Sequence, residues 1–144
     1  MPNANYTQTI TLYNCLHAVD SQDKKDHWYR HVLTDCFYKA AVTRIESGTN
    51  AGMQNTYTVR VPESDQYKPY AEWAELLEEE RKECFTAAVD DIVIAGECTE
   101  EITGATGQTA VQIMKRHKPD AFKVTAFSDN TKFLTAKHYR LGGG

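Results

Sequence analysis

The chain has no long apolar stretch and no surplus of positive charge, and each lack argues against a class of protein. Its apolar runs are short, such as Ile92-Val93-Ile94-Ala95, whereas a membrane-spanning helix needs roughly 18–20 apolar residues. Its 16 Lys and Arg face 20 Asp and Glu, a formal net charge of -4. Proteins that hold nucleic acid by its phosphates usually carry a basic surplus. We therefore expect neither a membrane protein nor a protein that grips DNA.

The N-terminus lacks the features of a secretory signal. Residues 1–5 are polar and contain neither a basic patch nor an apolar run. We expect these residues to be flexible. We also expect the protein to be made in a cytoplasm, from which it could still be built into a larger particle.

Cysteine is sparse and scattered along the chain. The four cysteines are Cys15, Cys36, Cys84 and Cys98, and no two form a Cys-x-x-Cys pair. In a cytoplasmic chain, cysteines with this spacing are usually free thiols or small buried hydrophobic residues. A disulfide framework is therefore not expected.

Histidine and cysteine together raise the question of a metal site. Cys15 and His17 could share one face of a strand, and so could His27 and His31. A structural zinc site needs four converging ligands, and no spacing in this sequence matches a zinc knuckle. We therefore predict no bound metal and no cofactor.

Catalytic motifs are also missing. The sequence contains no Gly-x-Ser-x-Gly, His-Glu-x-x-His, Walker-A or Gly-x-Gly-x-x-Gly pattern, which are common marks of hydrolases, zinc peptidases and nucleotide-binding sites. A nucleophilic cysteine needs a base and an orienting partner. The sequence alone does not show which histidine lies near which cysteine, so it identifies no nucleophile. We predict no catalytic residue and no enzymatic activity.

Alternation of apolar and polar residues predicts strands over much of the chain. The expected strands cover residues 6–13, 27–33, 36–45, 56–61, 85–89, 92–95, 122–127 and 137–141. Turns are expected at 34–35, 90–91 and 129–130, and a loop at 19–26. The glycines at 142–144 are expected to form a flexible end.

Two segments show helical periodicity instead. Residues 69–83 place Tyr70, Trp73 and either Leu76 or Leu77 on one face. The segment begins at a proline, which the first turn of a helix tolerates. The opposite face is acidic, either as a functional patch or as an ordinary solvated surface. Residues 108–117 form the second expected helix.

Together these segments predict one mainly β domain over residues 1–144, a β-rich α+β fold. Several short strands with turns between them are typical of a small antiparallel β-barrel or sandwich. Two short helices would decorate it, and a flexible loop at 46–55 would project from it. Long loops in small domains often carry function, which points to binding or assembly.

Two groups of residues are candidates for contact with a partner. Tyr67, Tyr70 and Trp73 belong to residue types that dominate interface hot spots, although they could equally form the stripe that faces the core. The second group, in the projecting loop, consists of Gly48, Asn50 and Gly52.

An ordered series of segments resembles an uncharacterised family of small proteins from the head-morphogenesis clusters of siphophages and prophages. The segments are Thr11-Leu12-Tyr13-Asn14, Trp28-Tyr29-Arg30, Val59-Arg60-Val61-Pro62, Val89-Asp90-Asp91-Ile92, Glu101-Ile102-Thr103-Gly104 and Ser128-Asp129-Asn130. The resemblance covers most of the chain. Asp90 stands where members of that family usually carry glycine, and Thr131 where they often carry arginine.

The resemblance implies a virion structural protein of a tailed bacteriophage, most specifically a head-completion or head–tail connector protein of the stopper type. Such proteins commonly form a β-barrel and assemble as a homo-oligomeric ring, here expected to be six- or twelve-fold, in the neck of the virion. The expected partners are other copies of the chain, a portal or adaptor protein, and a tail-tube or tail-completion protein. Packaged DNA would pass through the channel without sequence-specific binding, and no membrane partner is expected.

Other interpretations stay open at this point. Tail-completion, tail-terminator and minor capsid proteins share this size and β content. Outside the virion, the alternatives are a small-ligand-binding β-barrel and, behind it, a hydrolase.

Overall fold

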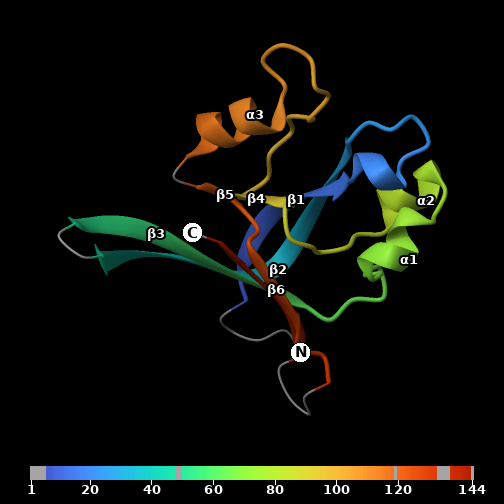
Figure 1. Cartoon of the computed structure of the whole chain (residues 1–144). Helices are drawn as coiled ribbons and strands as arrows, with labels where there is room; N and C mark the ends of the chain where they lie inside the picture. Colours follow the sequence, from blue (N-terminus) through green and yellow to red (C-terminus); the bar gives the residue numbers. More distant parts are fainter. Residues whose placement is uncertain (1–5, 48–49, 119, 133–136, 144) are drawn as a thin grey trace.

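The protein is built on one curled antiparallel β-sheet (Figure 1). The computed structural model describes residues 6–47, 50–118, 120–132 and 137–143, and within residues 42–55 it describes the backbone alone. Over these residues the sheet has seven strands in the order β5-β4-β1-β2-β3-β7-β6. The strands are β1 (Gln8–Leu16), β2 (His27–Ser47), β3 (Asn50–Pro62), β4 (Ile92–Ala95), β5 (Ala121–Lys123), β6 (Ala126–Asp129) and β7 (His138–Gly143).

Short helices lie outside the sheet. They are the 3-10 helix η1 (Ala18–Asp20) and the α-helices α1 (Tyr70–Ala74), α2 (Glu78–Glu83) and α3 (Ala110–His117). In Figure 1, η1, α1 and α2 lie together on one side and α3 lies apart from them. No helix in the described ranges combines the length and the apolar character needed to cross a membrane. The predicted fold class, mainly β with short helices, is confirmed.

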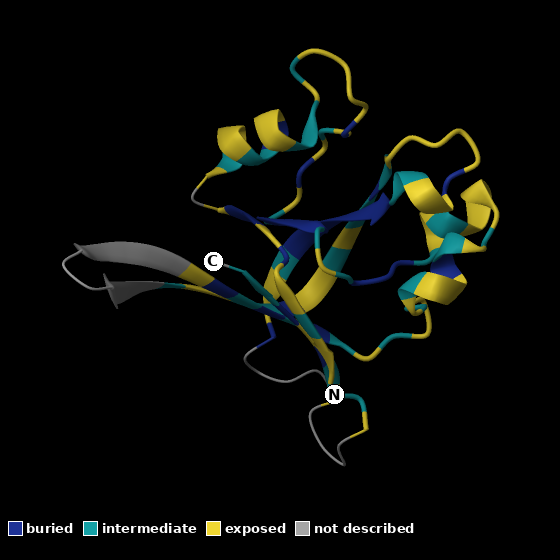
Figure 2. Cartoon of the chain, viewed as in Figure 1, coloured by how far each residue is buried: buried dark blue, intermediate teal, exposed yellow. Residues whose placement is uncertain are grey.

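The core fills the inside of the curled sheet and continues beneath the helices (Figure 2). All of residues 10–16 in β1 are buried, because β2 and β4 pair with the two edges of this strand. Inside the sheet, the rings of Tyr57 and Phe122 stack with centroids 4.7 Å apart. Trp73 beneath α1 and Ile113 beneath α3 have no exposed surface.

The two edges of the sheet are joined by a short stretch of chain. Edge strands β5 and β6 are separated only by Val124 and Thr125, so the predicted single strand at 122–127 is wrong. Val124 N donates to the Asp91 carbonyl (2.8 Å), and Thr125 N donates to the Gly142 carbonyl (2.8 Å). The first bond leads to the residue before β4 and the second to β7, and these strands stand next to opposite edges of the sheet. The two bonds therefore explain why the sheet curls toward closure.

β2 is one strand of 21 residues, whereas the sequence predicted two strands and a turn. Ile10 of β1 pairs with Leu33, but Gln8 pairs with Cys36, so β2 contains an extra residue at this point. Asp35 takes a positive φ of 56°. A β-bulge bends a strand without reversing it, and the predicted turn is therefore wrong.

β2 and β3 form a long hairpin that projects from the rest of the molecule (Figure 1). Their ladder extends to the pair Ser47 and Asn50, so most of the segment predicted as a flexible loop, 46–55, is strand. Gly52 fits in the ladder because glycine keeps both backbone hydrogen-bonding groups. Gly48 lies outside the described residues.

The helix predicted at 69–83 is divided into α1 and α2. Leu77 takes an extended conformation with ψ of 154° and stands as the N-cap of α2. Of the two leucines that could follow Trp73 on the apolar face, Leu76 packs against the Trp73 cluster. Leu77 is 71% exposed. The helix predicted at 108–117 is confirmed by α3, which begins at a capping box formed by Thr109 and Gln112.

The C-terminal glycines are not a free end over their described part. Gly142 and Gly143 belong to β7 and pair with β3. A Cβ at Gly143 would collide with the ring of Phe122 and lie 2.6 Å from the carbonyl oxygen of Lys123. Only glycine allows the backbones to approach this closely.

A buried polar cluster connects three segments that the sheet alone would leave separate. Asn14 Nδ2 donates to the Thr86 carbonyl (2.6 Å) and to Asp91 Oδ2 (2.9 Å), and Asn14 Oδ1 accepts from Thr86 N (3.1 Å). The Asp91 carboxyl also accepts from Cys15 N and Ala88 N, each at 3.0 Å. We define Asn14, Thr86 and Asp91 as the buried polar cluster.

This cluster explains why residues 85–89 are not the predicted strand. Apart from a single bridge between Phe85 and Tyr67, the segment forms no described ladder. The side chains of Asn14 and Asp91 instead bind the backbone of Thr86 and the Ala88 N–H. The predicted turn at Asp90 is confirmed, with φ of 82°. Glycine adopts that conformation without strain, whereas an aspartate there is strained.

We expect Asp91→Asn to lower the free energy of unfolding by on the order of 3 kcal/mol. The reason is that the NH₂ group of asparagine would face buried N–H donors to which the Asp91 carboxyl now accepts hydrogen bonds. Urea denaturation measures this change. Asp90→Asn is the matched control: asparagine tolerates positive φ, and only an exposed ion pair with Lys123 (3.4 Å) is lost. A loss as large in the control would contradict a specific role for Asp91.

The same substitution should make stability less dependent on pH. Burial raises the pKa of Asp91 from 3.8 to about 7, although hydrogen bonds from Cys15, Asn14 and Ala88 act in the opposite direction. A raised pKa means that the folded state holds the proton more tightly, so this stabilisation is greatest below pH 3.8 and is lost as the pH rises to about 7. The difference in unfolding free energy between wild type and Asp91→Asn should therefore decrease from pH 4 to pH 8 in urea titrations. A constant or increasing difference would refute the assignment.

Candidate functional site

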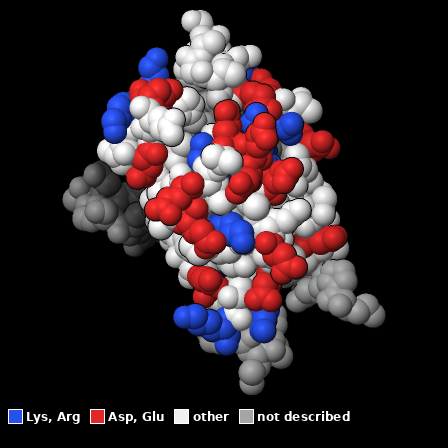
Figure 3. Space-filling model, turned by 90° about the vertical axis from the view of Figure 1, so that its right-hand side faces the viewer, with Lys and Arg blue, Asp and Glu red and all other residues white. Residues whose placement is uncertain are grey.

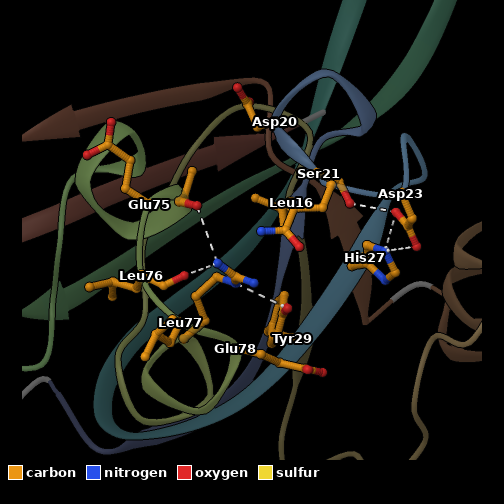
Figure 4. A pocket seen from close by; sticks show the side chains of 13 residues that line it. Leu16, Asp20, Ser21, Asp23, His27, Tyr29, Glu75, Leu76, Leu77 and Glu78 are labelled. Carbon is orange, nitrogen blue, oxygen red and sulfur yellow. Dashed lines mark hydrogen bonds and ion pairs between the residues drawn. The ribbon is translucent and has the colours of Figure 1, made fainter.

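A hollow of about 590 Å³ opens between η1, the start of β2 and the corner where α1 meets α2 (Figure 4). Its lining residues are Leu16, Asp20, Ser21, Gln22, Asp23, His27, Tyr29, Ala74, Glu75, Leu76, Leu77, Glu78 and Arg81. We call this feature the acidic hollow, because its rim carries four carboxylates. Asp and Glu side chains also gather over this face of the molecule (Figure 3).

Arg81 builds the wall of the acidic hollow at the helix corner. Its guanidinium donates to the Ala74 carbonyl (3.3 Å), to the Leu76 carbonyl and to the Tyr29 hydroxyl (3.1 Å) (Figure 4). It also lies 5.4 Å from the centroid of the Tyr29 ring. These contacts satisfy carbonyls that the helix break leaves without helical partners, so the charge of Arg81 is engaged within the fold.

Ser21, Asp23 and His27 on the rim have the residue types of a hydrolytic triad but not its geometry. Ser21 Oγ donates to Asp23 Oδ1 (2.6 Å), and His27 Nε2 lies 2.8 Å from the same carboxylate. In a triad the histidine stands between the hydroxyl and the carboxylate. Here the carboxylate stands in the middle and also accepts from Lys25 N (3.1 Å). This arrangement stabilises the loop and gives the serine no base.

The electrostatics of the acidic hollow favour a cationic or neutral polar partner. The hydroxyl of Ser21 and the imidazole of His27 hold the pKa of Asp23 well below its usual value, so this carboxylate is ionised at neutral pH. Asp20 accepts a hydrogen bond from the Tyr70 hydroxyl (2.6 Å). Phosphate groups would meet repulsion here, and a basic protein surface would not.

The structure separates the aromatic residues that the sequence proposed as partner contacts. Trp73 is fully buried, meets the ring of Tyr29 edge-on at 5.3 Å and donates its indole N–H to the Cys84 carbonyl (3.1 Å). Of the two alternatives left open for Trp73, the core stripe is therefore the one observed, and its side chain has no surface for a partner. Tyr70 stays partly exposed and ties α1 to η1.

Tyr67 also packs mainly inward. Its ring stacks on Tyr139 with centroids 4.0 Å apart and meets Phe85 edge-on at 5.8 Å. Asn50 and Gly52 lie in the projecting part of β3, where their contact with a partner stays a prediction, and Gly48 lies outside the described residues.

Two groups of potential metal ligands come together in the described part of the chain. The first is Cys15, His17 and Asp26, in which the sequence had placed the first two on one strand face. Cys15 Sγ and His17 Nδ1 are 3.8 Å apart. Burial, together with neighbouring carboxylates, raises the pKa of Cys15 to about 12. The proposed pair of His27 and His31 does not form a site, because His27 binds Asp23 and His31 packs near Phe85.

The second group is Cys98, Glu100 and His117, which sequence reasoning missed. The Cys-x-Glu spacing and a histidine at the end of a predicted helix were visible. Nothing in the linear sequence placed α3 against the loop that follows β4, so these residues had no reason to be grouped.

A curled antiparallel sheet with short outer helices and a projecting hairpin defines the class of this fold, a small β-rich α+β domain. Within that class, the chain belongs to DUF6751, a family of unknown function, which it matches over residues 5–144. No curated protein matches the chain. No solved structure matches it either.

Replacing Arg81 tests whether it holds the helix corner. Arg81→Met keeps an unbranched apolar stem but removes all three hydrogen bonds, and we expect a loss of about 1–3 kcal/mol in unfolding free energy. Lys82→Met on the same helix is the control, since Lys82 is exposed and only 4.0 Å from Glu78. Thermal and urea unfolding measure both; equal losses would show that Arg81 has no special role.

Proposed function

We propose that this protein is an assembly component of a tailed-phage virion, most specifically a stopper-type connector that forms a ring between a portal or adaptor and the tail. The observation that carries the proposal is the projecting arm, which we define as residues 37–47 of β2 with 50–55 of β3. The family resemblance of the sequence supports the same role.

Among the described residues, no third strand pairs with the arm along either of its two edges. β1 pairs with β2 only as far as Cys36, and β7 pairs with β3 only from Tyr57 onward. Beyond these points, in the described part of the chain, β2 and β3 pair only with each other.

A two-stranded ribbon that no other strand covers is unfavourable in a monomer. Two isolated strands are marginally stable in water, and open strand edges readily take up another chain. Pairing of an arm with a neighbouring copy would cover these open edges by strand addition. When the donor and acceptor surfaces differ and the rotation closes, such contacts generate a ring.

Packing and charge also fit a connector better than the ligand-binding alternative. Tyr57, Phe122, Leu141 and other core side chains fill the inside of the curled sheet. The net charge of -4 and the acidic face carrying α1 and α2 would suit a channel through which DNA slides, since like charge prevents phosphates from binding.

The decisive first test is the mass of the particle formed by the full chain and by an arm-shortened variant. In that variant, Asn-Gly replaces residues 43–54 and joins Val42 to Asn55, which already face each other in the ladder. We expect the wild type to form a ring as its concentration rises and the variant to remain monomeric. The far-UV circular dichroism spectrum of the variant should still show a folded β-sheet. Analytical ultracentrifugation and mass photometry measure this.

A control leaves the arm intact, keeps Gly104 because its φ is 84°, and replaces Ala105 and Thr106 by two other turn residues; it should assemble as the wild type does. A wild type that stays monomeric at high concentration, or an arm-shortened chain that still forms the ring, would overturn the assembly proposal.

Labelled virions test the location. Imaging with a label on this chain should place it at the neck. A label in the shell or along the tail would replace the connector by a minor capsid or tail-completion role, and absence from purified virions would refute a virion role altogether.

A further inference from the structure

Cys98, Glu100 and His117 converge where α3 ends against the loop that follows β4. Cys98 Sγ lies 3.5 Å from His117 Nε2. Glu100 Oε2 lies 2.6 Å from the same nitrogen and 3.9 Å from the sulfur. A thiol, a carboxylate oxygen and an imidazole nitrogen thus face one common point, at the edge of a core in which Cys98 is 4% exposed.

The loop side of this cluster is held by bonds to the sheet. Cys98 N donates to Thr11 Oγ1 (2.8 Å), and the Cys98 carbonyl accepts from Arg30 (3.1 Å). The Tyr13 hydroxyl donates to the Glu100 carbonyl (2.6 Å). The backbone at Cys98 and at Glu100 is therefore fixed to β1 and β2 before any ligand arrives.

The helix side is held equally well. Ile113 of α3 is fully buried and fixes the helix that carries His117. Arg116 binds the other carboxylate oxygen, Glu100 Oε1, at 2.7 Å, which leaves Oε2 directed at the cluster. Partners that orient a ligand in this way are typical of metal sites.

The geometry does not fit a nucleophilic triad. A triad uses both nitrogens of the histidine, one for the nucleophile and one for the carboxylate. Here Cys98 and Glu100 both face Nε2 of His117, so the imidazole cannot relay a proton between them. Convergence of all three groups on one point is the geometry of ligands around a cation.

We propose that Cys98, Glu100 and His117 bind one divalent cation of the zinc class, with a fourth coordination position open to water or to another ligand. Thiolate, imidazole and carboxylate are zinc's usual ligands, and bonds of about 2.0–2.3 Å in a tetrahedron set ligand atoms about 3.3–3.6 Å apart. The sulfur distances of 3.5 and 3.9 Å are near this range, and the 2.6 Å hydrogen bond opens by about 0.7 Å when the metal enters.

Binding exchanges protons for the metal. The Cys98 thiol loses its proton to solvent as the metal–sulfur bond forms, and any proton held between His117 Nε2 and Glu100 Oε2 leaves as both atoms turn to the metal. The thiolate and the carboxylate then balance the two positive charges. No oxidation or reduction takes place, and the metal would fasten α3 to the sheet.

The group of Cys15, His17 and Asp26 provides an internal comparison. Asp26 Oδ1 is already occupied by Ala18 N at 2.7 Å, and no described cation orients its carboxylate as Arg116 orients Glu100. We therefore expect the group that contains Cys98 to bind the divalent cation more tightly than the group that contains Cys15.

Titration of the full chain, freed of metal by dialysis against a chelator, tests the site with Zn²⁺ alone. Isothermal calorimetry in two buffers of different ionisation enthalpy gives the stoichiometry and the protons released. We expect one Zn²⁺ per chain, release of at least one proton and a raised melting temperature. Cys98→Ser and His117→Gln should each lower the affinity by more than about tenfold, since loss of an orienting partner alone costs about 10–100-fold, whereas Cys15→Ser should leave it within about twofold.

Co²⁺ gives a readout that a merely structural role would not change. Wild type and Cys15→Ser should show a thiolate-to-cobalt charge-transfer band that Cys98→Ser lacks. His117→Gln changes a partly exposed helix end and should keep the wild-type circular dichroism spectrum, so its loss of affinity reports on ligation. The proposal fails if wild type binds no stoichiometric Zn²⁺, if both ligand variants bind as wild type does, or if only Cys15→Ser loses binding.

Discussion

The fold depends on how one buried carboxyl group is satisfied. Asp91 accepts hydrogen bonds from Asn14, Cys15 and Ala88, and Asn14 in turn binds both backbone groups of Thr86. The C-terminal part of β1, the turn before β4 and the irregular segment ahead of that turn are thereby fixed together. An unpaired polar group at such depth would cost about 1–3 kcal/mol, so removing Asn14 or Asp91 would destabilise the fold. Because β4 and Val124 are both attached at this turn, it also sets where the sheet curls.

From this centre the molecule presents two unlike faces and one extension. The side with η1, α1 and α2 is acidic, and its single arginine in the hollow is engaged by carbonyl oxygens and Tyr29. The side with α3 carries the thiol, imidazole and carboxylate that converge beside the sheet. The arm formed by β2 and β3 extends beyond the pairing of β1 and β7. An assembly that covers the arm would leave both faces available, which separates the proposed metal site physically from the proposed ring contact.

Much of the fold was predictable because backbone periodicity is a local property. The strands β1, β4 and β7 and the helix α3 follow from alternation or from helical spacing. The errors have a common cause. Contacts with distant segments decide three features: the bulge at Asp35, the break at Leu77 and the strand conformation of Gly143. The proposed metal site was missed for the same reason, since Cys98 and His117 are 19 residues apart.

The sequence by itself determined the class of the fold, the positions of most strands and the acidic balance, since these depend on residue type and on spacing over a few residues. Only the tertiary structure decided that Trp73 belongs to the core, that a loop rich in small residues continues as paired strand, and that Cys98, Glu100 and His117 meet. Each of these outcomes depends on which segments pack together. That choice is governed by burial of the whole chain and by satisfaction of its polar groups, which no local pattern encodes.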